Sequence, residues 1–408
     1  MMENRYDRYK DSGIAWIGEI PEHWEVCSIK QIMKNKSIKG FPNETVLSLY
    51  RDLGVIPKDS REDNHNVTSE DTSNYKFVEE GDFVINKMKA WQGSMAISDY
   101  KGIVSPAYYV CKVINSKVDK KYIHYLLRNE SYKVEYMRLS TGMRIGQWDL
   151  NINDFLQINT IIPSVLEQQS IATYLDQKCG EIDELITLQE KMITKLQSYK
   201  QSVITEAVTK GLDKNVPLKD SGIEWIGKIP EHWKITKVQY LAQLKSGYNL
   251  TTEEITDNGL YPVYGGNGIR GYYDKYFLEG DYVLIGRQGA LCGNINYSTN
   301  KSWATEHAIV CYPKIKYVTR WFGELLRVMN LNQYSLAAAQ PGLAVERIKL
   351  LPIPIIPLSE QQSIADYLNQ KCSEIDELIS IKQQKIEKLK EYKKSLIFEC
   401  VTGKRKVS

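Results

Sequence analysis

Apolar residues recur at helical spacing in two long segments of the chain. In residues 182–207 they lie three or four positions apart, which puts them on one face of an α-helix. They are Ile182, Leu185, Ile186, Met192, Ile193, Leu196, Tyr199, Val203 and Ala207. Residues 375–397 repeat the pattern. The chain is therefore expected to contain two long amphipathic helices.

The ends of these helices carry recognisable signals. No Pro or Gly interrupts either segment before Gly211 or Gly403, and Gly is the residue that most often follows a helix C-terminus. Ser359 followed by Gln362 resembles a capping box at the start of the second helix.

Two pairs of repeats show that the chain is an internal duplication. The segment at 10–24, KDSGIAWIGEIPEHW, returns at 219–233 with 13 of 15 positions identical. The segment at 167–209, which opens with EQQSIA, returns at 360–402 with 27 of 43 positions identical. The order is short motif, variable block, long helix, and then the same three parts again.

The two variable blocks, 25–163 and 234–357, differ strongly but keep common landmarks. FVEEGDFVINK at 77–87 matches YFLEGDYVLIG at 276–286, and both blocks end in an apolar strand bounded by Pro, INTIIP and LPIPIIP. We expect one fold that carries two different surfaces, as two copies of a reading device with different specificities would.

We divide the chain into six parts on this basis. They are 1–24, 25–163, 164–212, 213–233, 234–357 and 358–408. We expect the two helices to pack against each other as an antiparallel pair, the alternative being that each packs only on its own domain. The tryptophans of the short motif are predicted to anchor onto a helix end or a block, rather than to bind a ligand. They are Trp16, Trp24, Trp225 and Trp233.

Composition narrows the class of protein. Apolar residues make up 42% of the chain and charged residues 25%, which is ordinary for a globular protein. No segment approaches the roughly 20 apolar residues of a membrane span, and the polar N-terminus lacks a signal core. The seven cysteines form no Cys-x-x-Cys, so we expect free thiols and no zinc site. A cytoplasmic protein without membrane contact is the prediction.

Charge and aromatic content are compatible with a polar partner. The net charge is only +3, but residues 234–357 carry 13 Lys and Arg against 9 Asp and Glu, whereas 164–212 carry 5 against 7. A basic block beside an acidic helix fits a protein that binds polyanions on particular faces. Tyr and Trp number 27 and 8 against 7 Phe. This bias fits either a surface that contacts something polar or compositional drift.

Together these features resemble the specificity (S) subunit of type I restriction-modification systems. The resemblance rests on the IPEHW pair, the EGD segments, the junctions from Pro to EQQ-IA-YL, and the two helices of about 43 residues. It implies an α+β fold, with two similar mixed α/β target recognition domains joined by two long conserved helices packed as an antiparallel coiled coil.

The resemblance also implies partners and cofactors. The expected partners are double-stranded DNA with a bipartite asymmetric site, two methyltransferase (M) subunits and the restriction/translocase (R) subunits. This chain is expected to hold no cofactor, because S-adenosylmethionine, ATP and Mg belong to the partner subunits. DNA methylation and cleavage would thus be activities of the complex in a restriction system.

No catalytic motif is found in the sequence. It lacks the [ND]-PP-[YF] motif of adenine methyltransferases, the P-loop, HExxH and GxSxG. VYGGNGIRGYY at 263–273 lacks a following helix pattern, so we interpret it as a tight turn in a binding face rather than a dinucleotide loop. The EGD carboxylates at 80–82 and 279–281 are interpreted as turn residues. The alternatives are a standalone nucleic-acid enzyme with a cryptic nuclease site and a scaffold for proteins alone.

Residues that contact DNA are expected in Gly-punctuated loops that carry planar polar or basic side chains. In the first block they are Lys87, Lys89, Trp91, Arg138, Arg144 and Gln147. In the second block they are Tyr264, Asn267, Arg270, Tyr272, Arg287, Gln288 and Gln340. Arg128 and Arg327 occupy matching positions in predicted helices, where a structural role is expected.

Overall fold

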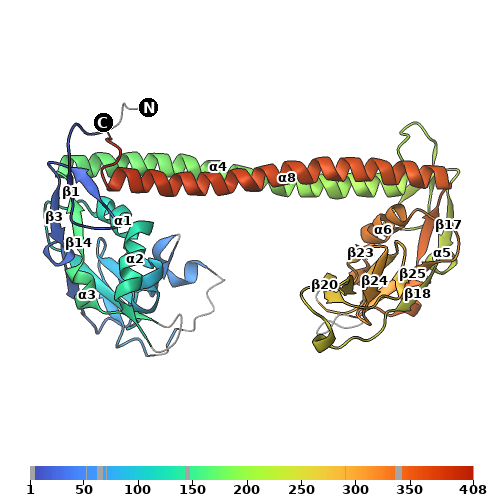
Figure 1. Ribbon diagram of the computed structural model, residues 1–408, viewed down its shortest axis with the longest axis horizontal. Helices are drawn as coiled ribbons and strands as arrows, with labels where there is room; N and C mark the ends of the chain where they lie inside the picture. Colours follow the sequence, from blue (N-terminus) through green and yellow to red (C-terminus); the bar gives the residue numbers. More distant parts are fainter. Residues whose placement is uncertain are drawn as a thin grey trace. The chain divides into compact units, whose positions relative to one another are not determined.

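The computed structural model divides the chain into two compact units (Figure 1). Unit 1 comprises residues 1–189 and 384–408, and unit 2 comprises residues 190–383. The structure describes residues 5–51, 53–61, 68–69, 71–142, 148–289, 291–335 and 342–407. Each unit therefore holds one variable block together with part of both long helices, and the expected division at 163/164 falls inside unit 1.

Both units are built on the same antiparallel four-stranded sheet. In unit 1 its order is β4 (Met33–Lys36), β11 (Tyr108–Val113), β8 (Phe83–Asn86) and β9 (Met95–Ile97). In unit 2 it is β18 (Ala242–Ser246), β25 (Ala308–Pro313), β22 (Val283–Gly286) and β23 (Ile295–Tyr297). Helices α1 (Lys120–Arg128) and α6 (Thr319–Val328) contact β9 and β23. The expectation of one fold in two copies is confirmed.

The EGD segments form the turns that lead into β8 and β22. Gly81 and Gly280 have φ of 84° and 125°, a region that side chains with a Cβ rarely adopt. Asp82 closes the first turn, because its Oδ2 accepts from the Glu79 backbone N–H at 2.8 Å. The interpretation of these carboxylates as turn residues is correct for this segment.

The remaining elements flank this sheet in each unit. Unit 1 adds β1 (Tyr9–Asp11), β2 (Glu19–Pro21), β3 (Glu25–Ser28), η1 (Ile29–Gln31), β5 (Leu47–Tyr50), β6 (Gly54–Pro57), η2 (Lys58–Ser60), β7 (Lys76–Val78), η3 (Lys87–Gln92), β10 (Gly102–Val104), α2 (Glu130–Leu139), β12 (Ser140–Thr141), β13 (Asp149–Leu150), α3 (Ile152–Gln157) and β14 (Asn159–Ile162). Unit 2 adds β15 (Leu218–Asp220), β16 (Lys228–Pro230), β17 (Lys234–Lys237), α5 (Val238–Leu241), η4 (Thr252–Glu254), β19 (Tyr261–Gly265), β20 (Gly268–Tyr273), β21 (Leu278–Glu279), β24 (Lys301–Ala304), η5 (Leu331–Tyr334), α7 (Val345–Ile348) and β26 (Pro352–Ile355).

The units differ in what lies beside the shared sheet. Unit 2 has a second four-stranded sheet in the order β20-β19-β24-β21, whereas unit 1 has the two-stranded pairs β5-β6 and β10-β7. By contrast, the strand that closes each block pairs with the strand that opens it, β14 with β3 and β26 with β17. The divergence between the blocks thus extends to the architecture of one layer.

The long helices are α4 (Val165–Lys210) and α8 (Leu358–Val401). Gly211 and Gly403 follow them with φ of 76° and 73°, which confirms the predicted left-handed stops. The predicted capping box at Ser359 is wrong, because α8 already begins at Leu358. A capping box forms instead at the start of α4, between Ser164 and Glu167.

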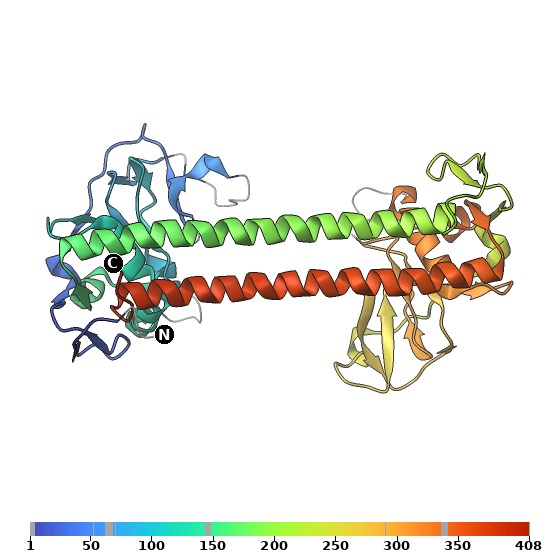
Figure 2. The same ribbon diagram turned by 90° about the horizontal axis from the view of Figure 1, so that it is seen from above.

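Within each unit the two helices pack side by side and antiparallel (Figure 2). In unit 1, Ile182 shares a hydrophobic cluster with Leu396 and Cys400. In unit 2, Val203 and Ala207 share one with Ile364 and Cys372. An equivalent ion pair joins the two helices in each unit, with an N–O distance of 2.7 Å in both. The pairs are Lys393–Asp183 in unit 1 and Lys200–Asp376 in unit 2. Not all of the predicted stripe is buried, since Leu185, Met192 and Tyr199 are exposed.

Candidate nucleic-acid interface

In unit 1 the repeated EHW and EQQ motifs contact each other directly. Glu167 Oε1 accepts hydrogen bonds from His23 Nε2 at 2.8 Å and from Trp24 Nε1 at 3.3 Å. Trp24 is fully buried, and a Cβ at Gly403 would lie 3.2 Å from its ring. One tryptophan therefore joins the start of α4 to the end of α8, which confirms its role as an anchor.

Unit 2 makes the same contact with the second copy of the motifs. Glu360 accepts from His232 Nε2 at 2.7 Å and from Trp233 Nε1 at 2.9 Å. The Trp233 ring is fully buried and would lie 3.3 Å from a Cβ at Gly211. Each pair of motifs thus fixes the position of the N-terminus of one long helix relative to the C-terminus of the other.

The glutamine after each glutamate fastens the variable block. Gln168 is fully buried; its Oε1 accepts from the Asp119 N–H at 2.7 Å and its amide donates to the Pro163 carbonyl at 2.8 Å. Gln361 accepts in the same way from the Val318 N–H at 2.9 Å. These bonds hold the loops that precede α1 and α6, so the block is tied to its helix by buried polar contacts.

Replacing Glu167 should reduce stability in a pH-dependent way. Burial alone would raise the pKa of Glu167, but hydrogen bonds from His23, Ser164 and Trp24 outweigh it and hold this pKa below its ordinary value. A depressed carboxyl pKa adds stability that is present above the unfolded value and is lost as pH falls through the folded value. We expect Glu167→Gln to lower the free energy of unfolding by about 1–3 kcal/mol at pH 7.

Urea unfolding of the full chain between pH 7 and pH 3 measures this effect. The difference between the wild type and Glu167→Gln should shrink as the pH falls below the ordinary glutamate value of 4.5. Glu184→Gln, at an exposed position of the same helix, is the matched control. A difference that stays constant down to pH 3 would contradict the assigned role of the charge.

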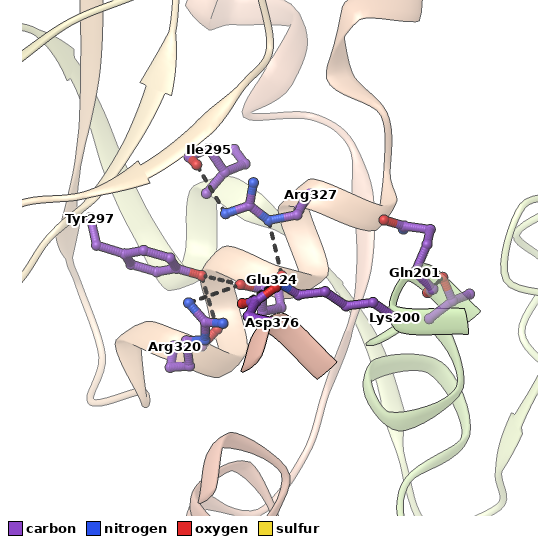
Figure 3. Close-up of polar contacts among 9 residues, drawn as sticks. Lys200, Gln201, Ile295, Tyr297, Arg320, Glu324, Arg327 and Asp376 are labelled. Carbon is purple, nitrogen blue, oxygen red and sulfur yellow. Dashed lines mark hydrogen bonds and ion pairs between the residues drawn. The ribbon is translucent and has the colours of Figure 1, made fainter. Parts of the chain in front are cut away.

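A buried charged cluster holds α6 in unit 2 (Figure 3). Glu324 is 1% exposed and accepts from Arg320 at 3.2 Å, Arg327 at 2.9 Å and the Tyr297 hydroxyl at 2.9 Å. Arg327 also donates to the Ile295 carbonyl at 3.0 Å. The buried Glu324 carboxylate is thus paired with two guanidinium groups, as a buried charge requires. The expectation of a structural role for Arg327 is confirmed.

The matching arginine of unit 1 is also tied to its own domain. Arg128 donates to the Arg51 carbonyl and contacts His124 Nε2 at 2.5 Å. Burial and the neighbouring Arg128 lower the pKa of His124 to about 3, so this histidine stays neutral at physiological pH. Arg128 therefore belongs to the structural framework as expected.

The first candidate residues of unit 1 lie on the short helix η3. Lys89 is exposed, and the Lys87 ammonium lies 4.6 Å from the centre of the Tyr109 ring. Trp91 packs edge-on against Trp148 at 5.1 Å between ring centres. The structure thus gathers a basic and aromatic surface at the end of β8, next to β11.

The other predicted DNA-contacting residues of unit 1 are either paired within the protein or lie outside the described residues. Arg138 forms a two-pronged ion pair with Glu135 on α2, with contacts of 2.7 and 2.6 Å. This pairing occupies much of its donor capacity. Arg144 and Gln147 lie outside the described residues, and Gln340 of unit 2 does too.

Two candidates of unit 2 are engaged by the protein itself. Tyr264 is 4% exposed and packs with Leu278 and Leu284, so its ring is not available to a ligand. The Arg287 guanidinium donates to Ser246 Oγ at 3.0 Å from a half-buried position. The sequence could not separate these two from their exposed neighbours, because strand alternation is irregular in a Gly-rich segment.

The remaining candidates of unit 2 converge on the turn of the β19–β20 hairpin. Asn267, Arg270 and Gln288 line an open pocket of about 460 Å³, and Tyr272 is half-buried on the same hairpin. His307 also lines the pocket, although no sequence motif pointed to it. His307 lies beside the pocket because it directly precedes β25, which pairs with β22. The hairpin itself confirms that residues 263–273 form a tight turn with no following helix.

The described residues bear on the enzymatic alternative as well. Within the described ranges, no group of three or more His, Cys, Asp or Glu is arranged to hold a metal ion. All seven cysteines are free thiols. Among the helices that the structure describes, none combines the length and apolar character needed to cross a membrane.

Comparison with known families agrees with this geometry. The model of the type I restriction modification DNA specificity domain matches residues 21–198 and 230–391, one match for each block with its helix. This chain belongs to that family. Members of it are the specificity subunits of type I systems, which recognise DNA sequence and are non-catalytic. The expected identity and the absence of a catalytic role are therefore confirmed.

Individual relatives support the assignment. The type I restriction enzyme EcoprrI specificity subunit of Escherichia coli is 37% identical over 134 residues, which cover 32% of this chain and 33% of the relative. The type I restriction enzyme MjaVIII specificity subunit of Methanocaldococcus jannaschii is 24% identical over 432 aligned positions, covering 95% of this chain and 94% of the relative.

Two solved structures show the same fold. One is a chain from a study of complex assembly and conformational transition of the type I R-M system, with a TM-score of 0.73 and 14% identity over 94% of this chain and 98% of that one. The other is the HsdS subunit from Thermoanaerobacter tengcongensis, with a TM-score of 0.54, 14% identity and the same coverage. These likenesses establish the mixed α/β fold with two long helices packed together.

Proposed function

We propose that this specificity subunit binds a bipartite, asymmetric DNA site, with one variable block on each half, and docks two methyltransferase subunits. The observation that carries the proposal is the contrast between the blocks. Their four-stranded sheets have the same strand order, while the strands beside those sheets are arranged differently. A conserved frame with two different surfaces suits two different half-sites.

The candidate contacts to DNA fit two roles. Lys87 and Lys89 in unit 1 carry compact charges suited to phosphates, which position a protein on the duplex. Asn267, Arg270 and Gln288 in unit 2 carry planar groups suited to base edges in the major groove. Two strands joined by a tight turn, such as the β19–β20 hairpin, have the width that the major groove admits.

Docking of two equal partners is supported by apolar side chains that the helices leave exposed. They occur in positions equivalent under the internal repeat: Leu185 and Leu378, Leu188 and Ile381, and Tyr199 and Tyr392. Each unit carries one member of every pair. Exposed apolar groups that recur in both copies favour two equivalent docking sites for methyltransferase subunits.

The catalytic steps then belong to the partners. The methyltransferase subunits would bring S-adenosylmethionine, and the restriction subunits would bring ATP and Mg, while this chain supplies the choice of sequence.

The test is reconstitution with and without the partners. The purified chain with S-adenosylmethionine and duplex DNA should transfer no methyl groups, and co-expression with its methyltransferase subunits should methylate a bipartite sequence. Leu185→Asp and Leu378→Asp should each remove one of two methyltransferase subunits from the purified complex, whereas Glu184→Gln should remove none. Methyl transfer by the partner-free chain, or loss of both subunits on either change alone, would refute the proposal.

A further inference from the structure

The pocket beside the β19–β20 turn is built from separate parts of unit 2 that glycines bring into contact. A Cβ at Gly266 would lie 3.0 Å from the Gln288 carbonyl and 3.3 Å from that of His307. A Cβ at Gly286 would lie only 2.1 Å from the Gly266 carbonyl. The turn can rest against the ends of β22 and β25 only because both positions lack a side chain. Its polar groups are thus held at set positions.

The hydrogen bonds around the pocket decide which way its amides point. Asn267 Oδ1 accepts from Asn294 Nδ2 at 2.8 Å, which leaves the Asn267 NH₂ group without a protein partner among the residues that the structure describes. Gln288 Oε1 lies 2.9 Å from His307 Nδ1, so the amide oxygen faces the ring and the NH₂ group is the part of the amide directed away from it. Both side chains therefore offer donors to a ligand.

Two further contacts fix the side chains around the pocket. His307 Nε2 lies 3.1 Å from a carboxylate oxygen of Glu306, so the ring is held between Gln288 and Glu306. The exposed Arg270 adds a guanidinium, which has donors and no acceptor, and its stem crosses Gly265, whose Cβ would lie 2.8 Å from Arg270 Cδ. The Arg270 side chain is thereby directed over the pocket.

Guanine offers the edge that matches these donors best. In the major groove guanine presents two acceptors, N7 and O6. Thymine presents one acceptor, O4, beside a methyl group, adenine presents one acceptor and one donor, and cytosine presents a donor. The side-chain donors of Asn267, Arg270 and Gln288 can meet both acceptors of guanine, whereas thymine offers them one acceptor and the N–H of adenine or cytosine would face another donor. We propose that Asn267, Arg270 and Gln288 form the base-reading site of unit 2 and select a guanine. This inference rests on the proposed DNA-binding function.

The experiment uses the complex of this chain with its methyltransferase subunits. Methylome sequencing of a host that expresses the complex gives the wild-type consensus, and competition among duplexes varied at each position gives the discrimination. With Arg270→Ala, a single position in one half, occupied by a G·C pair, should lose about 10- to 100-fold of its discrimination. All positions of the other half should be unchanged, which also shows that the variant is folded.

Two further variants sharpen the test. Gln288→Glu keeps the side-chain length but replaces the free donor by an acceptor, so guanine should become disfavoured at that same position in favour of a base with an exocyclic amine. Lys275→Ala removes one exposed positive charge of unit 2 outside the pocket and should leave the discrimination at that position intact.

The possible failures separate the two claims. A wild-type complex that methylates no defined sequence would refute the proposed function itself. A defined target with equal weakening of all sequences by Arg270→Ala would mean that this arginine contacts a phosphate, and would refute the guanine site alone. If Arg270→Ala lost discrimination at an A·T pair, or left the consensus unchanged, the guanine site would be refuted as well.

Discussion

Trp233→Ala should cost unit 2 about 3–5 kcal/mol of unfolding free energy, the range for removing a large aromatic ring from a packed interior. The ring is fully buried, donates to Glu360 and lies against Gly211, so its loss opens a cavity where one helix starts and the other ends. Trp24→Ala should have the same effect on unit 1, where the ring donates to Glu167.

Hydrogen exchange of the full chain distinguishes the two variants. Protection should fall mainly within residues 190–383 for Trp233→Ala, and mainly in the other unit for Trp24→Ala. Trp233→Phe retains most of the buried area but loses the N–H, so it should cost less than Trp233→Ala. Uniform loss of protection across both units would mean that the tryptophans do not act locally.

Lengthening both helices by one heptad should change the DNA target itself. α4 and α8 each contribute residues to both units, so we expect helix length to set the separation of the two half-sites. One heptad inserted after Gln189 and one after Gln383 would keep the apolar faces in phase and add ~10 Å at ~1.5 Å per residue. That equals about three base pairs at ~3.4 Å each.

Methylome sequencing of the complex reports the spacer directly. The double insertion should lengthen the unread spacer, although the added DNA twist of roughly 100° is expected to weaken binding. A heptad in α4 alone is the control; it should put the helices out of register and lower the yield of folded complex. A well-folded double insertion with an unchanged spacer would show that something other than the helices sets the distance.

Local pattern was enough to predict much of this architecture. Short stretches of sequence were enough to predict the duplication, the helical periodicity and the Pro-bounded strands. They also predicted the glycine stops at Gly211 and Gly403, and the structure contains each of these features. One local inference failed. The start of α8 was predicted at Ser359, but α8 begins one residue earlier, directly after Pro357. Pro357 takes the N-cap position instead of Ser359, because its carbonyl accepts the first helical hydrogen bond, from the Gln361 N–H at 3.0 Å.

The candidate interface was only partly predictable. Gly-rich loops with planar polar residues pointed to Asn267, Arg270 and Gln288, and these three do line one pocket. The same reasoning also chose Tyr264, which is buried, and missed His307. Residue type and flanking glycines do not reveal on which face of a twisted strand a side chain lies once a bulge changes the alternation, and the β19–β20 pairing shifts register between Val263 and Tyr264.

The sequence by itself determined that this protein has two copies of one domain, two long helices and a pair of conserved motifs, because repeats and periodicity are properties of neighbouring residues. The tertiary structure alone decided which distant residues meet. The contact of Trp24 with Glu167 spans 143 residues, and the pocket joins the β19–β20 turn to His307 through the pairing of separate strands. Such contacts form only when chain segments far apart in sequence fold together, and no local spacing encodes them.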